Sequence, residues 1–255
     1  METYYGHEFY DQKGIFEKYV SISAWRGIPS EQLEKSVVLS LLPPHLTGTV
    51  LDLGCGYGEL AQTLLQEGVK RYTGVDSSRK MIAFGNAVVK DQRAELIQAD
   101  ITKWTYPSET YDLVVACSVL HYIDDLNNVL AKIRESMTAG GTFIFSVDHP
   151  LLSYFLKPSS PLLNYQALET SGKWVTLNYF DQGPRVKMWS DALVVKYHRT
   201  IEAYWKSLTE AGFRVEALKE GSPASKADSE EQEQKPKGGF YPDMPMYLIL
   251  KAVKM

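Results

Sequence analysis

The stretch from Val50 to Gly58 reads VLDLGCGYG and decides the fold of this chain. A short apolar run carries the carboxylate Asp52 and is followed by glycines at every second position, Gly54, Gly56 and Gly58. This pattern predicts a strand that ends in a turn, where a ligand can lie directly against the backbone. The spacing differs from the Gly-x-Gly-x-x-Gly of dinucleotide-binding folds, and alone it is a weak signal.

Strand-like and helix-like segments alternate around this turn, as is typical of a parallel sheet covered by helices. The expected strands are residues 49–53, 71–75, 94–98, 111–117, 142–147, 213–218 and 246–253. The expected helices include residues 59–66, closed by Gly68, and residues 78–90 and 200–211. A further helix is predicted by the apolar stripe Leu126, Val129, Leu130 and Ile133, and it is expected to stop at Gly140-Gly141.

Composition limits the class of protein. The 255 residues, 44% of them hydrophobic, suffice for one large α/β core. A net charge of −4 provides no positive field for a nucleic-acid backbone. Cys55 and Cys117 lie in or beside apolar strands, which favours buried thiols in a reducing compartment. No apolar run is long enough to span a membrane, so we expect a soluble cytoplasmic protein.

Clean periodicity is lost from Asp148 to about Ser190, where prolines and the aromatic run 174–180 occur. We interpret this segment as an insertion that covers the carboxyl edge of the sheet, with His198 beginning the helix that follows. The charged stretch 222–237 is expected to be a mobile loop. One domain is expected, divided into residues 1–46, 47–147, 148–198 and 199–255.

Carboxylates follow the ends of the first three expected strands. In an open parallel sheet, ligands bind beyond the carboxyl ends of the strands. Asp76 is placed to accept hydrogen bonds from the two hydroxyls of a ribose, and Asp100 can accept one from an exocyclic amine such as that of adenine. Each aspartate alone is as well explained by a helix cap or a turn. Together with Asp52 and the glycine turn, they fit an adenosine with a compact charged tail.

These motifs closely resemble the class I S-adenosylmethionine-dependent methyltransferases. The resemblance covers residues 49–147 and rests on the glycine turn, on GVDSS at 74–78 followed by Met81, on ADI at 99–101, on YDLV at 111–114 and on MTAGGT at 137–142. It implies a Rossmann-like, mostly parallel seven-stranded sheet of order 3-2-1-4-5-7-6, with helices on both faces and the last strand antiparallel. It implies that S-adenosylmethionine is the cofactor and S-adenosylhomocysteine the product.

The resemblance also assigns cofactor contacts. Asp76 would bind the ribose and Asp100 the adenine amine, while Gly54, Gly56 and Cys117 would line the methionine portion. A narrower resemblance, carried by segments 143–150, 179–185 and 195–200, is to a group of generic bacterial and fungal methyltransferases of small molecules. It implies a helical lid at residues 19–42. The full set of expected cofactor residues is Tyr19, Arg26, Asp52, Gly54, Cys55, Gly56, Asp76, Ser77, Met81, Asp100, Ile101 and Cys117.

Transfer from a sulfonium is an in-line displacement that mainly needs alignment, and a base is needed only where the acceptor must lose a proton. His121 follows the fourth strand, His149 the fifth, and His198 the insertion. Histidine exchanges protons near neutral pH, which makes these three the candidate catalytic residues. The alternative for each is a hydrogen bond to loop backbone.

The insertion supplies candidate substrate contacts in Tyr179, Arg185 and Arg199. Arginine binds carboxylates with paired hydrogen bonds, although for either arginine alone a surface ion pair is the better explanation. The dense aromatic residues of the insertion favour a partly apolar site. We expect no metal, since no cluster of carboxylates and histidines has ligand spacing.

The leading hypothesis is methyl transfer to a small, partly aromatic or acidic metabolite, with oxygen slightly preferred over nitrogen as acceptor. We expect a small-molecule substrate, and neither nucleic acid nor membrane as partner. The alternatives are a transfer RNA or protein methyltransferase, and a non-methylating cofactor-binding protein or cyclase on the same fold. The fourth strand lacks the Asn-Pro-Pro-Tyr type of sequence used on planar nitrogens, which disfavours adenine and glutamine substrates.

Overall fold

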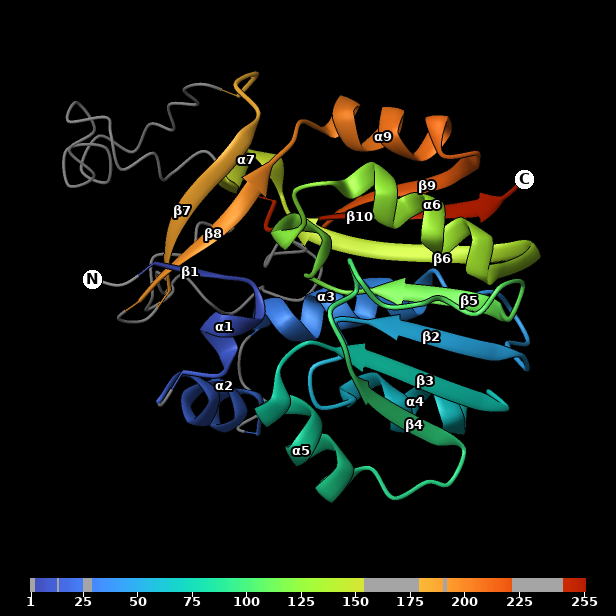
Figure 1. The fold of residues 1–255 in the computed structure, drawn as a ribbon. Helices are drawn as coiled ribbons and strands as arrows, with labels where there is room; N and C mark the ends of the chain where they lie inside the picture. Colours follow the sequence, from blue (N-terminus) through green and yellow to red (C-terminus); the bar gives the residue numbers. More distant parts are fainter. Residues whose placement is uncertain (1–2, 13, 25–28, 154–178, 190–191, 222–244) are drawn as a thin grey trace, which may run out of the picture.

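The computed structural model describes residues 3–12, 14–24, 29–153, 179–189, 192–221 and 245–255. Its centre is a seven-stranded sheet of order β4-β3-β2-β5-β6-β10-β9 (Figure 1). The strands are β2 (Thr49–Leu53), β3 (Arg71–Asp76), β4 (Ala94–Gln98), β5 (Tyr111–Ala116), β6 (Met137–Asp148), β9 (Phe213–Gly221) and β10 (Tyr247–Lys254). β10 runs antiparallel to both neighbours, so the predicted Rossmann-like order 3-2-1-4-5-7-6 is confirmed.

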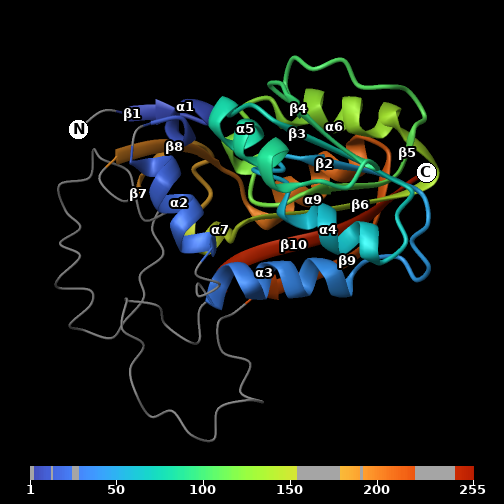
Figure 2. The ribbon, with the colours of Figure 1, turned by 90° about the horizontal axis from the view of Figure 1, so that it is seen from below.

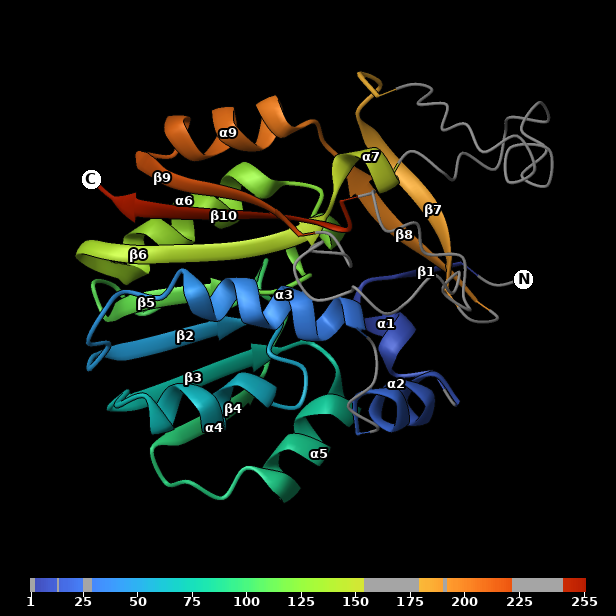
Figure 3. The same cartoon turned by 180° about the vertical axis from the view of Figure 1, so that it is seen from behind.

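Helices cover both faces of this sheet because its central strands are apolar on both sides. Along β5, Leu113 and Val115 pack into one cluster with helices α3 and α4, whereas Val114 and Ala116 pack into another with α6 and α9. Figures 2 and 3 show α3 and α4 on the same side of the sheet. The helices are α3 (Pro29–Ser40), α4 (Glu59–Gln66), α5 (Arg79–Val88), α6 (Leu126–Ser136) and α9 (Ile201–Glu210).

The expected end of the helix at Gly140-Gly141 is wrong. α6 ends at Ser136, and β6 begins at the next residue. Met137 pairs with Tyr111 and Thr142 pairs with Leu113, so the extra residues between these pairs form an irregularity in β6. Gly140 has a φ of 73°, and a glycine is suited to such a bulge. The glycines therefore mark a bulge within the strand.

A second sheet joins the expected insertion to the amino-terminal segment. β7 (Gly183–Trp189) and β8 (Ala192–His198) form an antiparallel pair, and β1 (Thr3–Tyr5) runs parallel to β8. In Figure 1 this sheet lies beyond the end toward which β3 and β5 point. The sequence did not indicate β8 as a strand because the adjacent Val194 and Val195 are both buried, which removes the alternation that marks a half-exposed strand.

His198 does not begin the helix after the insertion, as was expected, but ends β8. α9 starts at Ile201 because the hydroxyl of Thr200 accepts a hydrogen bond from the amide of Ala203, at 3.1 Å, and so caps the helix. The division of the chain into four parts stays a prediction.

The remaining elements are short or belong to the expected lid. They are α1 (His7–Tyr10), α2 (Ile15–Ala24), a 3-10 turn (Leu120–Tyr122) and α7 (Pro150–Ser153). Arg26, the loop 222–237 and most of the aromatic run 174–180 lie outside the described residues. None of the helices that the structure describes is long and apolar enough to cross a membrane.

Candidate functional site

The glycine turn after β2 is held against the neighbouring strand. The amides of Gly54 and Cys55 both donate to the carbonyl of Val75, at 2.7 and 3.2 Å. A Cβ on Gly54 would lie 2.5 Å from the side chain of Val119, whereas a Cβ on Gly56 would meet no atom within 4 Å. Gly54 is thus required for close packing, and the backbone at Gly56 borders open space. A ligand can approach the chain there, as the sequence predicts.

Asp76 ties the glycine turn to the start of α5. One carboxylate oxygen accepts the amide of Gly56 at 3.0 Å, and the other accepts the amide of Ser78 at 2.8 Å. A carboxylate has about four acceptor positions, and each of its oxygens can accept from more than one donor. The residues present therefore fit the two hydroxyls of a ribose.

Asp100 follows β4 in a turn of its own. One oxygen accepts the amide and the hydroxyl of Thr102, at 2.9 and 2.7 Å, and the other lies 3.4 Å from the ammonium group of Lys103. Partial burial raises the pKa of Asp100, but the bonds from Thr102 and Lys103 outweigh this and lower it below its usual value. The group is therefore an acceptor at neutral pH, which suits an exocyclic amine. Ile101 beside it is buried.

Asp52 lies inside the sheet. It is buried and accepts a hydrogen bond from the hydroxyl of Tyr72 at 2.5 Å. Burial raises the pKa of Asp52 to about 7, with further contributions from Asp76 and Glu59, although the Tyr72 bond lowers it. Its role toward a cofactor stays a prediction, and Tyr72 is a partner that the sequence did not indicate.

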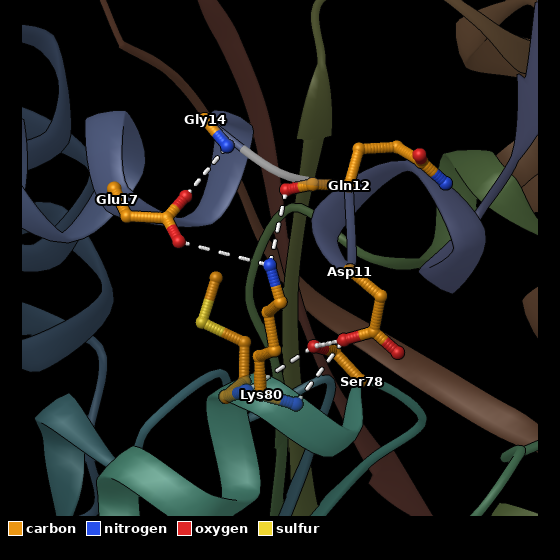
Figure 4. Close-up of polar contacts among 7 residues, drawn as sticks. Asp11, Gln12, Gly14, Glu17, Ser78 and Lys80 are labelled. Carbon is orange, nitrogen blue, oxygen red and sulfur yellow. Dashed lines mark hydrogen bonds and ion pairs between the residues drawn. The ribbon is translucent and has the colours of Figure 1, made fainter.

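The amino-terminal segment is attached to the start of α5 through Asp11 (Figure 4). The carboxylate of Asp11 accepts the hydroxyl of Ser78 at 2.6 Å and the amides of Lys80 and Arg79 at 3.1 and 3.3 Å. These are free amides of a helix N-terminus, where negative charge is stabilised. Ser78 also receives the amide of Met81 at 3.2 Å. Asp11 thus connects the amino-terminal segment to residues next to Asp76, and no local motif identified it.

Lys80 strengthens this attachment. Its ammonium group donates to the carbonyl of Gln12 at 3.4 Å and lies 3.8 Å from the carboxylate of Glu17, which itself accepts the amide of Gly14 at 2.6 Å (Figure 4). Lys80 also lies over the ring of Phe16, 5.7 Å from its centroid. α2 is therefore fixed at the same edge of the sheet as the predicted cofactor residues.

Three tyrosines form a cluster between the lid and the ends of the strands. The hydroxyls of Tyr10 and Tyr122 are 3.0 Å apart, and the ring of Tyr19 packs edge-on against that of Tyr10 with centroids 5.6 Å apart. Burial raises the pKa of both Tyr10 and Tyr122 well above the usual value, so both hydroxyls stay protonated. Tyr19, an expected cofactor residue, lies in this cluster.

A buried polar cluster lies at the ends of β5 and β6, and its members are Glu34, Ser118, Ser146, Asp148 and Lys196. Glu34, from α3, accepts the hydroxyls of Ser118, at 2.6 Å, and Ser146. The ammonium group of Lys196 lies 2.6 Å from the carboxylate of Asp148, with 12% and 13% of the two side chains exposed. Sequence reasoning missed Glu34, Asp148 and Lys196 because they come from segments far apart in the chain.

Each predicted catalytic histidine is buried and has a partner in the structure. Nδ1 of His121 accepts the amide of Asp148 at 3.1 Å, and Nε2 of His198 lies 2.7 Å from the carbonyl of Tyr179. Nε2 of His149 lies 2.8 Å from the carboxylate of Glu220. Burial lowers the pKa of His149 and His198 below the usual value. Of the three, His121 is bonded to the buried polar cluster, and their catalytic roles stay predictions.

The predicted substrate residues hold the chain in place. Arg199 donates to the carbonyls of Ile123 and Asp124, at 2.6 and 2.5 Å, and buried Arg185 donates to the carbonyl of Asp181. The hydroxyl of Tyr179 accepts the amide of Ile201 at 3.2 Å. Their roles toward a substrate stay predictions.

The remaining expected cofactor residues lie near the turn and the strand ends. Cys55 and Met81 are buried, and Ser77 and Cys117 are half-buried. Burial raises the pKa of both thiols, so neither is a reactive thiolate. Within the described residues, no group of three or more histidine, cysteine or carboxylate side chains is arranged to hold a metal ion.

Known proteins share this fold. A family model described as a methyltransferase domain matches residues 51–145. The structure of an S-adenosylmethionine-dependent methyltransferase from Mesorhizobium loti is similar, with a TM-score of 0.72, 27% identity and coverage of 87% of this chain and 98% of that one. A Listeria monocytogenes protein assigned to the same activity has a TM-score of 0.71 and 26% identity, over 88% of this chain and 99% of that one.

Among curated sequences, this chain is 28% identical to the trans-aconitate 2-methyltransferase of an Escherichia coli O157:H7 strain over 199 residues, which cover 78% of this chain and 67% of that protein. The domain match includes β2 to β5 and most of β6, where the glycine turn, Asp76 and Asp100 lie. The residues that fit an adenosine ligand therefore belong to the part of the chain that matches.

Proposed function

We propose that this chain, a class I S-adenosylmethionine-dependent methyltransferase, transfers a methyl group to an oxygen atom of a small acidic or aromatic metabolite. S-adenosylmethionine is its cofactor. When bound, it supplies an electrophilic methyl group on a sulfonium. The proposal concerns the acceptor.

The chain's own residues bind and orient the donor. Asp76 would hold the ribose hydroxyls through its carboxylate, and Asp100 would accept the adenine amine. The open backbone at Gly56 would lie against the methionine portion. Because in-line displacement depends mainly on alignment, rigid attachment of these residues is the main catalytic requirement. Asp11 contributes by fixing Ser78 and the start of α5.

One observation carries the choice of a small acceptor: the polar side chains beside the donor site are buried. Glu34, Ser146 and His121 are all less than a tenth exposed, and the amino-terminal segment is bonded across the neighbouring edge. A polymer bound on an open surface would not reach them. The name of the Escherichia coli relative identifies a small organic acid as that protein's acceptor, which supports the same class here.

An assay with labelled cofactor tests the proposal. Purified protein is incubated with a metabolite extract and S-adenosylmethionine that carries a trideuterated methyl group. We expect a labelled small-molecule ether or ester, formed in proportion to S-adenosylhomocysteine. Labelled transfer RNA or protein in a total cell lysate, with no labelled small molecule, would instead establish the first alternative function. Cofactor binding by calorimetry without any labelled product would favour a non-methylating protein.

A further inference from the structure

We propose that Glu34 is the base that takes the proton of the acceptor, and that the acceptor is therefore a hydroxyl group and not a carboxylate. This inference rests on the proposed function and narrows its substrate class. It follows from where Glu34 lies, how its oxygens are used and what surrounds it.

Glu34 lies at the ends of β5 and β6, where it contacts Ser118 and Ser146. Ser118 follows the end of β5, which pairs with β2, the strand that carries the glycine turn. β2 and β5 lie on either side of the point where the strand order reverses, and ligands of open α/β sheets bind at such points. The carboxylate of Glu34 is brought there from α3, the helix that packs on one face of the sheet beside α4.

The hydrogen bonds of Glu34 are consistent with an ionised carboxylate. Both serine hydroxyls donate to the same oxygen, Oε1. The hydroxyl of Ser146 can do this because its own acceptor position is used by the amide of Ser118, at 2.9 Å. Among the residues that the structure describes, no donor is bonded to Oε2. Oε2 is thus the oxygen that can receive a proton.

The backbone of Ser118 has an unusual conformation. Its φ is 52°, a left-handed conformation that a serine adopts rarely. Two bonds from its amide to Ser146, to the carbonyl at 3.1 Å and to the hydroxyl at 2.9 Å, fix this conformation. It directs the Ser118 hydroxyl to Glu34. Such conformations persist where the surroundings over-determine them, often at active sites.

The charges around Glu34 adjust how readily it takes a proton. Burial raises the pKa of Glu34 most, Asp148 raises it further, and the bonds from Ser118 and Ser146 and the charge of Lys196 lower it. Burial and the charge of Glu34 raise the pKa of the Cys117 thiol, which stays protonated. The balance leaves a carboxylate that is more basic than an ordinary glutamate, as a general base near neutral pH requires.

The proposed reaction forms one bond, breaks one bond and moves one proton. The acceptor oxygen forms a bond to the methyl carbon while the bond between that carbon and sulfur breaks, and its proton passes to Oε2 of Glu34. Solvent then removes the proton from Glu34 after the products leave. A carboxylate acceptor has no proton to lose and would meet the repulsion of ionised Glu34, whereas the charge of Asp148 is paired with that of Lys196. The cluster therefore favours a neutral hydroxyl.

The test compares Glu34→Gln with Glu34→Asp, with Glu67→Gln as the matched control at an exposed glutamate. In the labelled-extract assay at saturating cofactor, we expect Glu34→Gln to lower product formation by about a hundredfold or more. Its affinity for S-adenosylhomocysteine should stay within about twofold of the native value, because Glu34 contributes little to binding of the product. Glu34→Asp should keep a loss of rate toward acidic pH, and Glu34→Gln should lack it.

A second readout needs no turnover. Carbon NMR is recorded on protein labelled at the glutamate carboxyl groups and bound to S-adenosylhomocysteine. The Glu34 signal is identified as the one that is absent from Glu34→Gln. Its pH titration should give a pKa above the usual glutamate range. If Glu34→Gln fails to fold, Glu34→Asp and Ser146→Ala provide the test instead. Glu34→Asp should still lose rate toward acidic pH, and in Ser146→Ala this loss of rate should occur at a different pH.

The outcomes separate the inference from the function on which it rests. A labelled methyl ester of a carboxylic acid, or native-like rates and pH dependence in Glu34→Gln, would overturn the role of Glu34 and leave the proposed function intact. An absence of any labelled product with the native protein would overturn the proposed function, and the inference with it.

Discussion

At the ends of β2, β3 and β4, the cofactor residues contact one another over short sequence separations, whereas the buried polar cluster joins segments that are distant in sequence. The exception on the cofactor side is Asp11, which lies 67 positions from its partner Ser78. Asp76 and Gly56 are separated by 20 positions. Glu34 and Ser146 are separated by 112 positions, and Asp148 and Lys196 by 48. Because one side forms within a single βαβ region and the other requires the lid and β8, the two sides should respond differently to substitution.

The largest effect is expected at Asp76. In Asp76→Ala, S-adenosylmethionine should bind about a hundredfold to a thousandfold more weakly, because two charge-assisted hydrogen bonds are worth about 3–5 kcal/mol together. Calorimetry measures this loss. Asp91→Ala, at an exposed carboxylate, is the control and should bind normally. If the affinity of Asp76→Ala for S-adenosylmethionine is unchanged, Asp76 does not bind the ribose. The expected difference between the cofactor side and the buried polar cluster would then be lost.

Lys196 should affect stability more than cofactor affinity. Lys196→Met leaves the carboxylate of Asp148 buried without its cation, and breaking a buried pair in this way costs about 3–5 kcal/mol. Urea unfolding should show this loss, while binding of S-adenosylhomocysteine stays near the native value. The double variant Lys196→Met with Asp148→Asn should recover much of the stability. If the single and double variants are equally unstable, the pair does not hold the buried polar cluster together.

A pH effect of intermediate size is expected at Asp52. Its pKa rises from an ordinary 3.8 to about 7 on folding, so the folded state favours the protonated form. The corresponding stability is fully present below pH 4 and is lost as the pH rises toward 7. Asp52→Asn should remove this contribution. Between pH 4 and 8, its free energy of unfolding should therefore fall by about 1–3 kcal/mol less than that of the native protein. If the free energies of unfolding of the two proteins change equally with pH over that range, Asp52 does not have a raised pKa in the folded state.

The smallest effect is expected at Asp11. Asp11→Ala removes the cap that joins the amino-terminal segment to α5, which is worth about 1 kcal/mol. Cofactor affinity should fall about fivefold, and proteases should cleave the amino-terminal segment sooner. Glu8→Ala is the control, since Glu8 is exposed on the same segment. Equal cleavage rates in both variants would show that Asp11 does not secure the segment.

The same contrast explains what could be predicted from the sequence. The strand β2, the glycine turn and Asp76 were identified because each has a local signal: an apolar run, a glycine spacing, a carboxylate at a strand end. The order of the seven strands followed from the resemblance that these signals carry.

The rest has no such signal. Glu34 is one of several acids in a helix, and only its contact with Ser118 and Ser146 distinguishes it. Lys196 lies in β8, which was not expected to be a strand because its buried valines do not alternate with polar residues. The partners of the histidines could not be inferred either, because sequence spacing does not say which backbone groups a ring will meet.

The short strand β1 has a consequence for the order of events at the site. It pairs with β8 through Thr3, Tyr4 and Tyr5, while Asp11, a few residues later, is bonded to the start of α5. A displacement that uncovers Ser78 therefore also pulls on the strand that carries Lys196. We therefore expect binding of the donor to slow the release of the acceptor, and binding of the acceptor to slow the release of the donor.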